Sequence, residues 1–172
     1  MYKDQIELVV RSYNKIPLPN YPDSEQIDVW DAYRHFFQDV YHLKDWILND
    51  DNLSIEKKAL EDFFEGSKEM KLLQSLVTGF KHYKVSDKHM SYKKFYLSWE
   101  DYGGLKPSPE IMYYEDKDSV DSDGVVHPRV LAAKVLREWN TFFANSKLEG
   151  NFDINDNDWG LEYILKQAKT NS

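Results

Sequence analysis

The most regular pattern of apolar and polar residues lies between residue 24 and about residue 49. Apolar side chains recur there every three or four positions, at Val29, Trp30, Tyr33, Phe36, Phe37, Val40, Leu43 and Ile47. This spacing predicts a long helix that buries one face. Asp23 or Ser24 can cap its start, and Gln26 lies three positions after Asp23, as a capping box requires. We therefore expect this helix to organise the core.

The segment before this helix permits two interpretations. Residues 2–15 have apolar side chains at helical spacing, namely Ile6, Val9, Val10 and Tyr13. A strand is the alternative, because Ile6, Leu8 and Val10 lie at the period of two that a strand requires. Three prolines between positions 17 and 22 then exclude a continuing helix and predict an extended connector.

Two shorter helices are predicted on either side of Gly66. Ser54 can cap the first, which continues through Phe63 and Phe64 and ends at Gly66. Ser67 can cap the second. The apolar stripe of this second helix consists of Met70, Leu73, Leu76, Val77, Phe80 and Tyr83.

Between about residues 86 and 126 the helical spacing gives way to short aromatic and β-branched runs. These runs are residues 95–97, 111–114 and 125–126. Glycines, prolines and the polar turn at 121–124 separate them, as between the strands of an antiparallel sheet. This region therefore predicts a small antiparallel sheet.

The last long helix is expected to begin at Pro128, because proline suits the first turn of a helix. Its inward positions would be Leu131, Val135, Leu136, Trp139, Phe142 and Phe143. Gly150 lies just past the expected end, where glycine commonly terminates a helix. A polar stretch at 151–158 then leads to a short final helix, predicted for residues 159–169.

Together these elements predict a single domain of residues 1–172 with a mainly helical α+β fold. Three long helices and some short ones would form a bundle, with a small antiparallel β insertion around residues 86–126. The composition agrees, because 41% of the 172 residues are hydrophobic and 15% are aromatic, which is ample for a folded core. The seven glycines and six prolines suit long helices better than a many-turned β fold.

Composition and charge also narrow the compartment and the partners. The chain has no cysteine, which excludes disulfides and thiolate metal sites. With no signal peptide and no apolar run of about 20 residues, it is expected to be soluble and cytoplasmic, away from membranes. The net charge of −8 opposes binding to nucleic-acid phosphates, so a protein partner is expected instead. Any cofactor and the oligomeric state are left open.

Candidate chemistry lies on the polar face of the helix at residues 24–49. A rotation of 100° per residue places His35 and His42 two turns apart, opposite the apolar stripe, with Asp39 nearby and Asp45 at the border. His35, Asp39 and His42 are candidate metal ligands, and His42 is also a candidate acid or base near neutral pH. The alternative is that this face is the solvated outside of a surface helix.

Three further residues could join His42 and Asp45 in a catalytic site. His82 and Lys81 would approach from the later helix across a shared cleft. Lys44 falls within the apolar stripe, where a buried ammonium needs an acidic partner or a lowered pKa. The alternative for Lys44 is that its stem packs while its head reaches solvent past the helix end.

Several known signatures do not occur. The sequence contains no glycine-rich phosphate loop, no nucleophile elbow and no dinucleotide-binding fingerprint. The acidic run at 121–124 departs from a calcium-binding loop, because alignment on Gly124 puts Ser119 first and Val130 last. The helical ribonucleases of the HEPN type have four to six residues between an Arg and a His, whereas seven residues lie between Arg34 and His42. Ordinary nucleotide and hydrolase machinery is therefore not indicated.

The run His-Phe-Phe-Gln-Asp-Val-Tyr-His-Leu-Lys-Asp-Trp at 35–46 resembles a pattern in a family of short, uncharacterised bacterial and phage proteins. That family also has a Gly-x-Lys-His element in a later helix, matched at 79–82, and then a hairpin region and a Trp-x-x-Phe helix, matched at 139–142. The resemblance covers about residues 25–148 and implies a shared helical core. The positions that it marks are His42, Lys44, Asp45, Lys81 and His82. It implies no activity.

Two hypotheses of function follow. The first is a non-enzymatic interaction protein, of phage or mobile-element origin by the resemblance, that uses an acidic or aromatic surface. Its contact region would be residues 86–126, because tyrosine and tryptophan anchor interfaces. The second is a small hydrolase or nuclease, metal-dependent or not. In it His42 and His82 would exchange protons and the lysines would stabilise an anion.

Overall fold

Five helices and three strands follow one another within the residues that the computed structural model describes, which are 1–17, 26–81, 91–100 and 108–154. The elements are α1 (Tyr2–Asn14), α2 (Gln26–Leu48), α3 (Lys57–Gly66), α4 (Lys68–Lys81), β1 (Lys94–Glu100), β2 (Ser108–Tyr114), β3 (Gly124–Val126) and α5 (Pro128–Ser146). This confirms the mainly helical α+β fold with a small sheet between the later helices. The final helix predicted for residues 159–169 lies outside the described residues.

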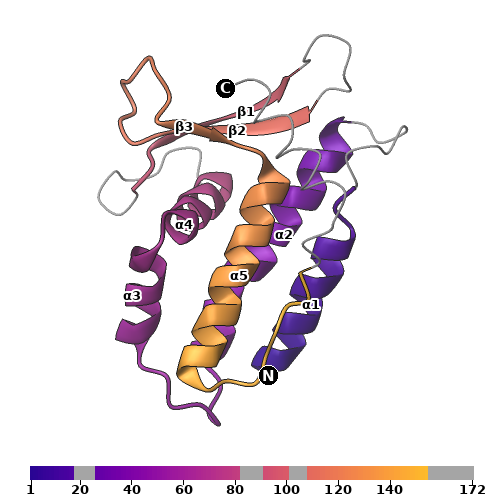
Figure 1. Cartoon of the computed structure of the whole chain (residues 1–172), viewed down its shortest axis with the longest axis vertical. Coiled ribbons are helices and arrows are strands. Elements are labelled where there is room, and N and C mark those ends of the chain that lie inside the picture. Colours follow the sequence, from indigo (N-terminus) through magenta and orange to yellow (C-terminus); the bar gives the residue numbers. More distant parts are fainter. Residues whose placement is uncertain (18–25, 82–90, 101–107, 155–172) are drawn as a thin grey trace.

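The helices are stacked side by side, and the sheet lies across one end of them (Figure 1). Helix α1 packs along α2, while α4 contacts α2, α3 and α5. The sheet lies above the end of the bundle at which α5 begins, and β2 contacts α5 there. No helix in the described ranges is both long enough and apolar enough to cross a membrane.

Helix α2 buries the face that the sequence predicts. The apolar side chains that are almost completely buried on it are Tyr33, Phe36, Phe37, Val40, Leu43 and Ile47. They recur at the helical period, so one side of the helix faces α1, α4 and α5. The prediction that this helix organises the core is confirmed. Its expected caps, Asp23 and Ser24, lie outside the described residues.

The first segment is a helix, so the strand alternative is wrong. Its buried side chains are Tyr2, Gln5, Val9 and Ser12, which recur every three or four residues. Val10, by contrast, is 40% exposed. The Gln5 side chain reaches α2 and donates a hydrogen bond from Nε2 to the carbonyl of Asp39, at 2.7 Å. The inward face thus includes polar residues, which explains why apolar positions alone left the choice open.

One of the two predicted serine caps is confirmed and the other is wrong. Ser67 Oγ accepts a hydrogen bond from the backbone N–H of Met70 at 3.1 Å, as expected of a cap at the start of α4. Helix α3, however, begins at Lys57, and Glu56 occupies the capping position with extended backbone angles and no side-chain cap. Ser54 lies two residues too early in the chain to act as the cap.

The sheet is antiparallel with the strand order β1-β2-β3. All three runs predicted from the sequence lie within these strands. In the register, Phe95 of β1 faces Tyr113 of β2, and Ile111 of β2 faces Val126 of β3. Ile111 and Tyr113 are buried, so this side of the sheet packs onto the helices.

Helix α5 begins at Pro128 as predicted, and the side chain of His127 accepts the backbone N–H of Arg129 as its cap. All six inward positions expected for this helix are buried. The end is not set by Gly150, however. The helix stops at Ser146, and Lys147 takes the left-handed conformation with φ 54°. The backbone N–H of Lys147 then bonds to the last turn, which satisfies carbonyls that the helix leaves open.

Candidate functional site

The structure brings His42 and Asp45 together, as the sequence predicts for one turn of a helix. His42 Nδ1 lies 3.0 Å from Asp45 Oδ2, and both side chains are partly exposed on α2. A carboxylate at this distance can hold an imidazole in one orientation. The pair lies on the surface of the helix.

His35 and Asp39 line a different feature, a groove of about 490 Å³ between α1 and α2. The residues that line it are Leu8, Arg11, Ser12, Lys15, Asp28, Asp31, Ala32, His35 and Asp39. His42 is not among them. His35 and His42 are seven positions apart, which is a rise of about 10 Å along the helix axis, so the two imidazoles lie at different places on α2. Among the described residues no group of three or more His, Asp or Glu could hold a metal ion.

The two walls of this groove carry opposite charges. Arg11 lies on α1 and Lys15 directly follows its end, whereas Asp28, Asp31 and Asp39 lie on α2. In the part of the chain that the structure describes, no salt bridge joins one wall to the other. The side chains of these residues are exposed, except that of Asp39, which is half-buried.

Lys44 is held by aromatic rings. Its ammonium Nζ donates a hydrogen bond to the hydroxyl of Tyr41 at 2.5 Å, and it lies 3.8 Å from the centre of the Tyr41 ring. The ring of Phe64 on α3 is 5.4 Å away. A cation above ring faces is stabilised by the ring quadrupole, so the stem can pack in the apolar stripe. No described salt bridge includes Lys44.

The remaining predicted catalytic residues are not described. Lys81 is the last residue of α4, but the structure describes only its backbone, and His82 lies in the gap that follows. The predicted cleft between α2 and α4 therefore depends on residues outside the described ranges. Within them, His42 and Asp45 meet, whereas Lys44 points to the rings of Tyr41 and Phe64.

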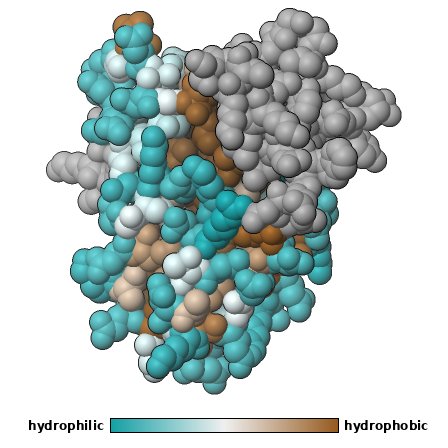
Figure 2. Space-filling view, viewed as in Figure 1, coloured by the Kyte–Doolittle hydropathy of each residue, from teal (hydrophilic) through white to brown (hydrophobic). Residues whose placement is uncertain are grey.

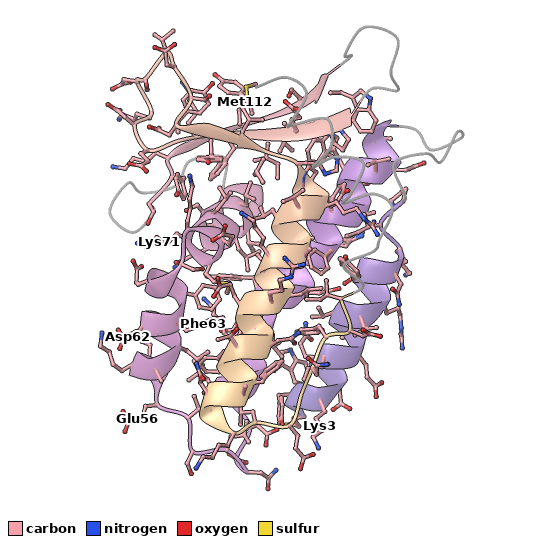
Figure 3. The ribbon with its side chains drawn as sticks, viewed as in Figure 1. Lys3, Glu56, Asp62, Phe63, Lys71 and Met112 are labelled. Carbon is pink, nitrogen blue, oxygen red and sulfur yellow. The ribbon has the colours of Figure 1, made fainter. Side chains whose placement is uncertain are left out.

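The outer side of the sheet presents an apolar row that crosses all three strands. Tyr96 of β1 is directly opposite Met112 of β2, which in turn is opposite Val125 of β3. Tyr96 and Val125 are 51% and 50% exposed. Met112 lies on the side of the sheet away from the helices (Figure 3). We call Tyr96, Met112 and Val125 the outer row.

An acidic loop flanks the outer row. Residues 115–123 join β2 to β3 and contain five acidic residues and one lysine. Val120 within this loop is 91% exposed. Figure 2 shows the loop as predominantly hydrophilic, with an apolar side chain at its tip.

Lys94 holds the loop against the sheet. Its ammonium donates to the carbonyls of Lys117 and Ser119, at 3.3 and 3.0 Å. It also lies 4.4 Å from the centre of the Tyr114 ring and 5.4 Å from that of Tyr96. These contacts place the acidic loop beside the outer row.

Sequence reasoning proposed residues 86–126 as a contact region but missed the outer row itself. The signal was present, because a sheet with one covered side should alternate apolar and polar residues. Here Tyr96, Met112 and Val125 are apolar, although their positions in the register lie on the side of the sheet away from the helices. The register was needed to recognise that these three belong together.

Sequence reasoning also overlooked His127, at the start of α5. Burial and, as the smaller cause, the nearby positive charge of Arg129 together lower the pKa of its imidazole to about 3. The side chain is therefore neutral near pH 7 and serves as a hydrogen-bond acceptor for the helix start. The signal in the sequence was a residue able to accept a bond immediately before a helix-starting proline.

Comparison with protein-family models, with curated proteins and with solved structures finds no match for this chain.

Proposed function

We propose that this chain is a non-enzymatic interaction protein and that the outer row is the centre of its contact surface. The carrying observation is that Tyr96, Met112 and Val125 stand in register across all three strands, with two of them half exposed. Tyrosine and methionine are enriched at protein interfaces, because they contribute large apolar area with a polar or adaptable end.

The surroundings of the outer row indicate the chemistry of the partner. The acidic loop at 115–123 forms one border, and Val120 extends from it into solvent. An apolar centre with a charged rim is the usual anatomy of an interface. The complementary surface would therefore be an apolar patch bordered by lysine or arginine. Opposite charges would steer the encounter, and association should slow as salt is raised.

The test compares two variants that place the same charge at two exposed valines, Val125 and Val10. Val125→Lys puts an ammonium in the outer row, whereas Val10→Lys puts one on α1, where Val10 is 40% exposed. A charge that must be desolvated on binding weakens an interface, so Val125→Lys should reduce partner binding at least about tenfold. Each tagged variant would be used to capture proteins from a cell lysate. The affinity of the captured protein would then be measured with purified components.

The expected result is a protein that binds the wild type and Val10→Lys equally and is lost with Val125→Lys. Reversing two loop charges, with Asp118→Lys and Asp121→Lys, should slow its association. A partner that binds all variants alike would contradict the proposed surface. Capture of no partner by the wild type would contradict the function itself.

A hydrolase or nuclease is the second candidate, and the His42–Asp45 contact favours it. At 3.0 Å the carboxylate can hold the imidazole in one orientation, as general bases require. If this pair is catalytic, His42→Ala should lower any hydrolysis of nucleic acid or ester substrates at least about 100-fold. His35→Ala, on the same helix but in the groove, should leave the rate unchanged. Equal rates for wild type and His42→Ala would eliminate this candidate.

A further inference from the structure

We propose that two copies of this chain pair through the free edge of β1, so that two three-stranded sheets join into one. This inference goes beyond the proposed function, because it uses the edge of the sheet rather than its outer row. In the described part of the chain β1 has β2 on one side and no strand on the other. The backbone N–H and C=O groups along such an edge are a template for another strand.

The composition of β1 makes this edge unusually suited to pairing. Edge strands are normally protected by charges or proline within the strand. In β1 the five central residues, Phe-Tyr-Leu-Ser-Trp, carry neither, and the two charged residues occupy the ends. Tyr96 and Leu97 are neighbours that point to opposite sides of the sheet, and both are exposed, at 51% and 43%. The centre of the strand therefore has one exposed side chain on each side of the sheet.

The sequence of β1 is complementary to itself in one antiparallel register. If a two-fold axis passes through Leu97, residue 94 of one copy lies opposite residue 100 of the other. Position 94, which holds lysine, then lies opposite position 100, which holds glutamate, once at each end of the new ladder. Opposite charges in directly facing positions stabilise a strand pair, whereas like charges destabilise it.

The same register matches the remaining side chains. Phe95 would face Trp99 on the inner side, Tyr96 would face Ser98 on the outer side, and Leu97 would face its own copy. Residues opposite one another in an antiparallel pair project to the same side, so each sheet keeps its helices on the inner side. A shift by two residues in either direction would leave residues of β1 unpaired and separate Lys94 from Glu100. A two-fold axis is also the commonest symmetry of homo-oligomers. These features favour a second copy over a strand from another protein.

The experiment measures the mass of the purified full chain by sedimentation over a dilution series. The wild type should approach twice its monomer mass of 20.4 kDa as concentration rises. Lys94→Glu and Glu100→Lys each place like charges opposite one another at both ends. Each variant alone should dimerise at least about tenfold more weakly than the wild type. An equal mixture of the two variants should recover the dimer, because every facing pair is then opposite in charge.

Leu97→Lys provides a test that leaves the contacts of Lys94 in place. In the dimer this variant would place two ammonium groups next to each other at the two-fold axis, so it should be a folded monomer. Leu48→Lys, at a similarly exposed leucine on α2, is the control. Val125→Lys should keep the dimer, which separates this proposal from that of the outer row.

Four outcomes would overturn the proposal. The first is a wild type that stays at 20.4 kDa at all concentrations, and the second is a Leu97→Lys variant that still dimerises. The third is that the two charge variants do not pair with each other. The fourth is a complex whose mass matches this chain plus a different polypeptide.

Discussion

At the scale of single residues, Trp139 lies in an aromatic cluster that joins α5 to α3. The rings of Phe63 and Phe64 on α3 are 4.8 and 6.0 Å from its own, between ring centres, and Phe142 and Phe143 extend the cluster along α5. Edge-to-face arrangements of this kind contribute beyond the area they bury. The indole Nε1 is buried with no hydrogen-bond partner among the described atoms. Trp139 therefore contributes to this cluster through its volume more than through its N–H group.

This leads to a prediction for two substitutions at Trp139. Trp139→Phe keeps most of the volume and removes an unsatisfied donor, so it should cost less than about 1.5 kcal/mol of unfolding free energy. Trp139→Ala empties the cluster and should cost about 3–5 kcal/mol. Urea denaturation of the wild type and both variants measures the difference. Equal losses would mean that the N–H has a stabilising role of its own.

A second prediction at this scale concerns His127 and acid stability. The pKa of His127 is about 3 in the folded chain and about 6.5 when unfolded, so between these values only the unfolded state binds the proton. Stability should therefore fall as the pH drops below about 6.5, by about 2 kcal/mol between pH 7 and pH 5. His127→Asn retains a side-chain acceptor for the helix start and should remove this part of the loss.

Unfolding by urea at pH 7 and pH 5 measures the effect. The same substitution at the exposed His35, His35→Asn, is the control. An equal acid loss in wild type and His127→Asn would show that other groups cause it.

Lys44 shows why a single residue can be misjudged from its position on a helix. The helical period places Lys44 among the apolar positions of α2, and in the structure its ammonium lies beside aromatic rings. The helical period does not reveal that Tyr41, three positions earlier, and Phe64, on another helix, offer ring faces to its ammonium. Only the packing of α3 against α2 supplies this environment.

At the scale of elements, the two serines before α3 and α4 make a direct comparison. Ser67→Ala removes the hydrogen bond to the Met70 N–H and should cost about 1 kcal/mol of unfolding free energy. Ser54→Ala changes an exposed side chain ahead of α3 and should alter stability by less than about 0.5 kcal/mol. Thermal unfolding of the two variants in parallel tests this. The reverse order would mean that the start of α3 depends on Ser54.

Helices in which the apolar residues follow one clear helical period could be predicted from the sequence. A segment whose apolar residues fit both a helix and a strand could not. The buried stripe of α2 and that of α5 repeat over many turns, so local spacing identifies both helix and inward face. Helix α1 is shorter and buries Gln5 and Ser12, which hydropathy counts as outward. The ends of the helices were harder still to predict, because a cap depends on backbone angles such as the left-handed φ of Lys147 at the end of α5.

At the scale of the whole molecule, Asp50 connects the start of α1 to the turn after α2. Its carboxylate accepts the backbone N–H of Tyr2 at 3.2 Å and that of Asn52 at 3.1 Å. The hydroxyl of Tyr2 in turn donates to the carbonyl of Glu149, and Lys3, labelled in Figure 3, forms an ion pair with the Glu149 side chain. Three segments that are distant in sequence meet at this end of the bundle.

The pKa of Asp50 leads to a prediction for this junction. Hydrogen bonds from the backbone N–H groups of Asn52 and Tyr2 lower it to about 2, from an ordinary value near 4. The stabilisation is therefore fully present above about pH 4 and is lost as the pH falls toward 2.

Asp50→Ala should lower the melting temperature by several degrees at pH 7. The difference from the wild type should shrink between pH 4 and pH 2. Asp51→Ala, at the exposed neighbour, should have little effect. A difference that is the same at pH 2 and pH 7 would rule out the ionised carboxylate as the cause.

The candidate surfaces were less predictable than the helices. The residues of each surface come from separate segments, and no local period connects them. The sequence placed His42 near Asp45 because three residues bring side chains together on any helix. The groove between α1 and α2 required the packing of two helices to bring Arg11 and Asp31 to the same groove. The outer row required the register of three strands.

The amino-acid sequence by itself determined the α2 and α5 helices, the inward faces of both, and the three short strands. These follow from periodic spacing and turn residues, which act over a few neighbouring positions. Only the tertiary structure decided that α1 is a helix with a partly polar inner face and that Lys44 contacts aromatic rings. It also decided that the pKa of His127 is lowered, and that Tyr96, Met112 and Val125 form one row. These features depend on which distant segments pack together, and that choice is made by the burial of apolar surface over the whole chain.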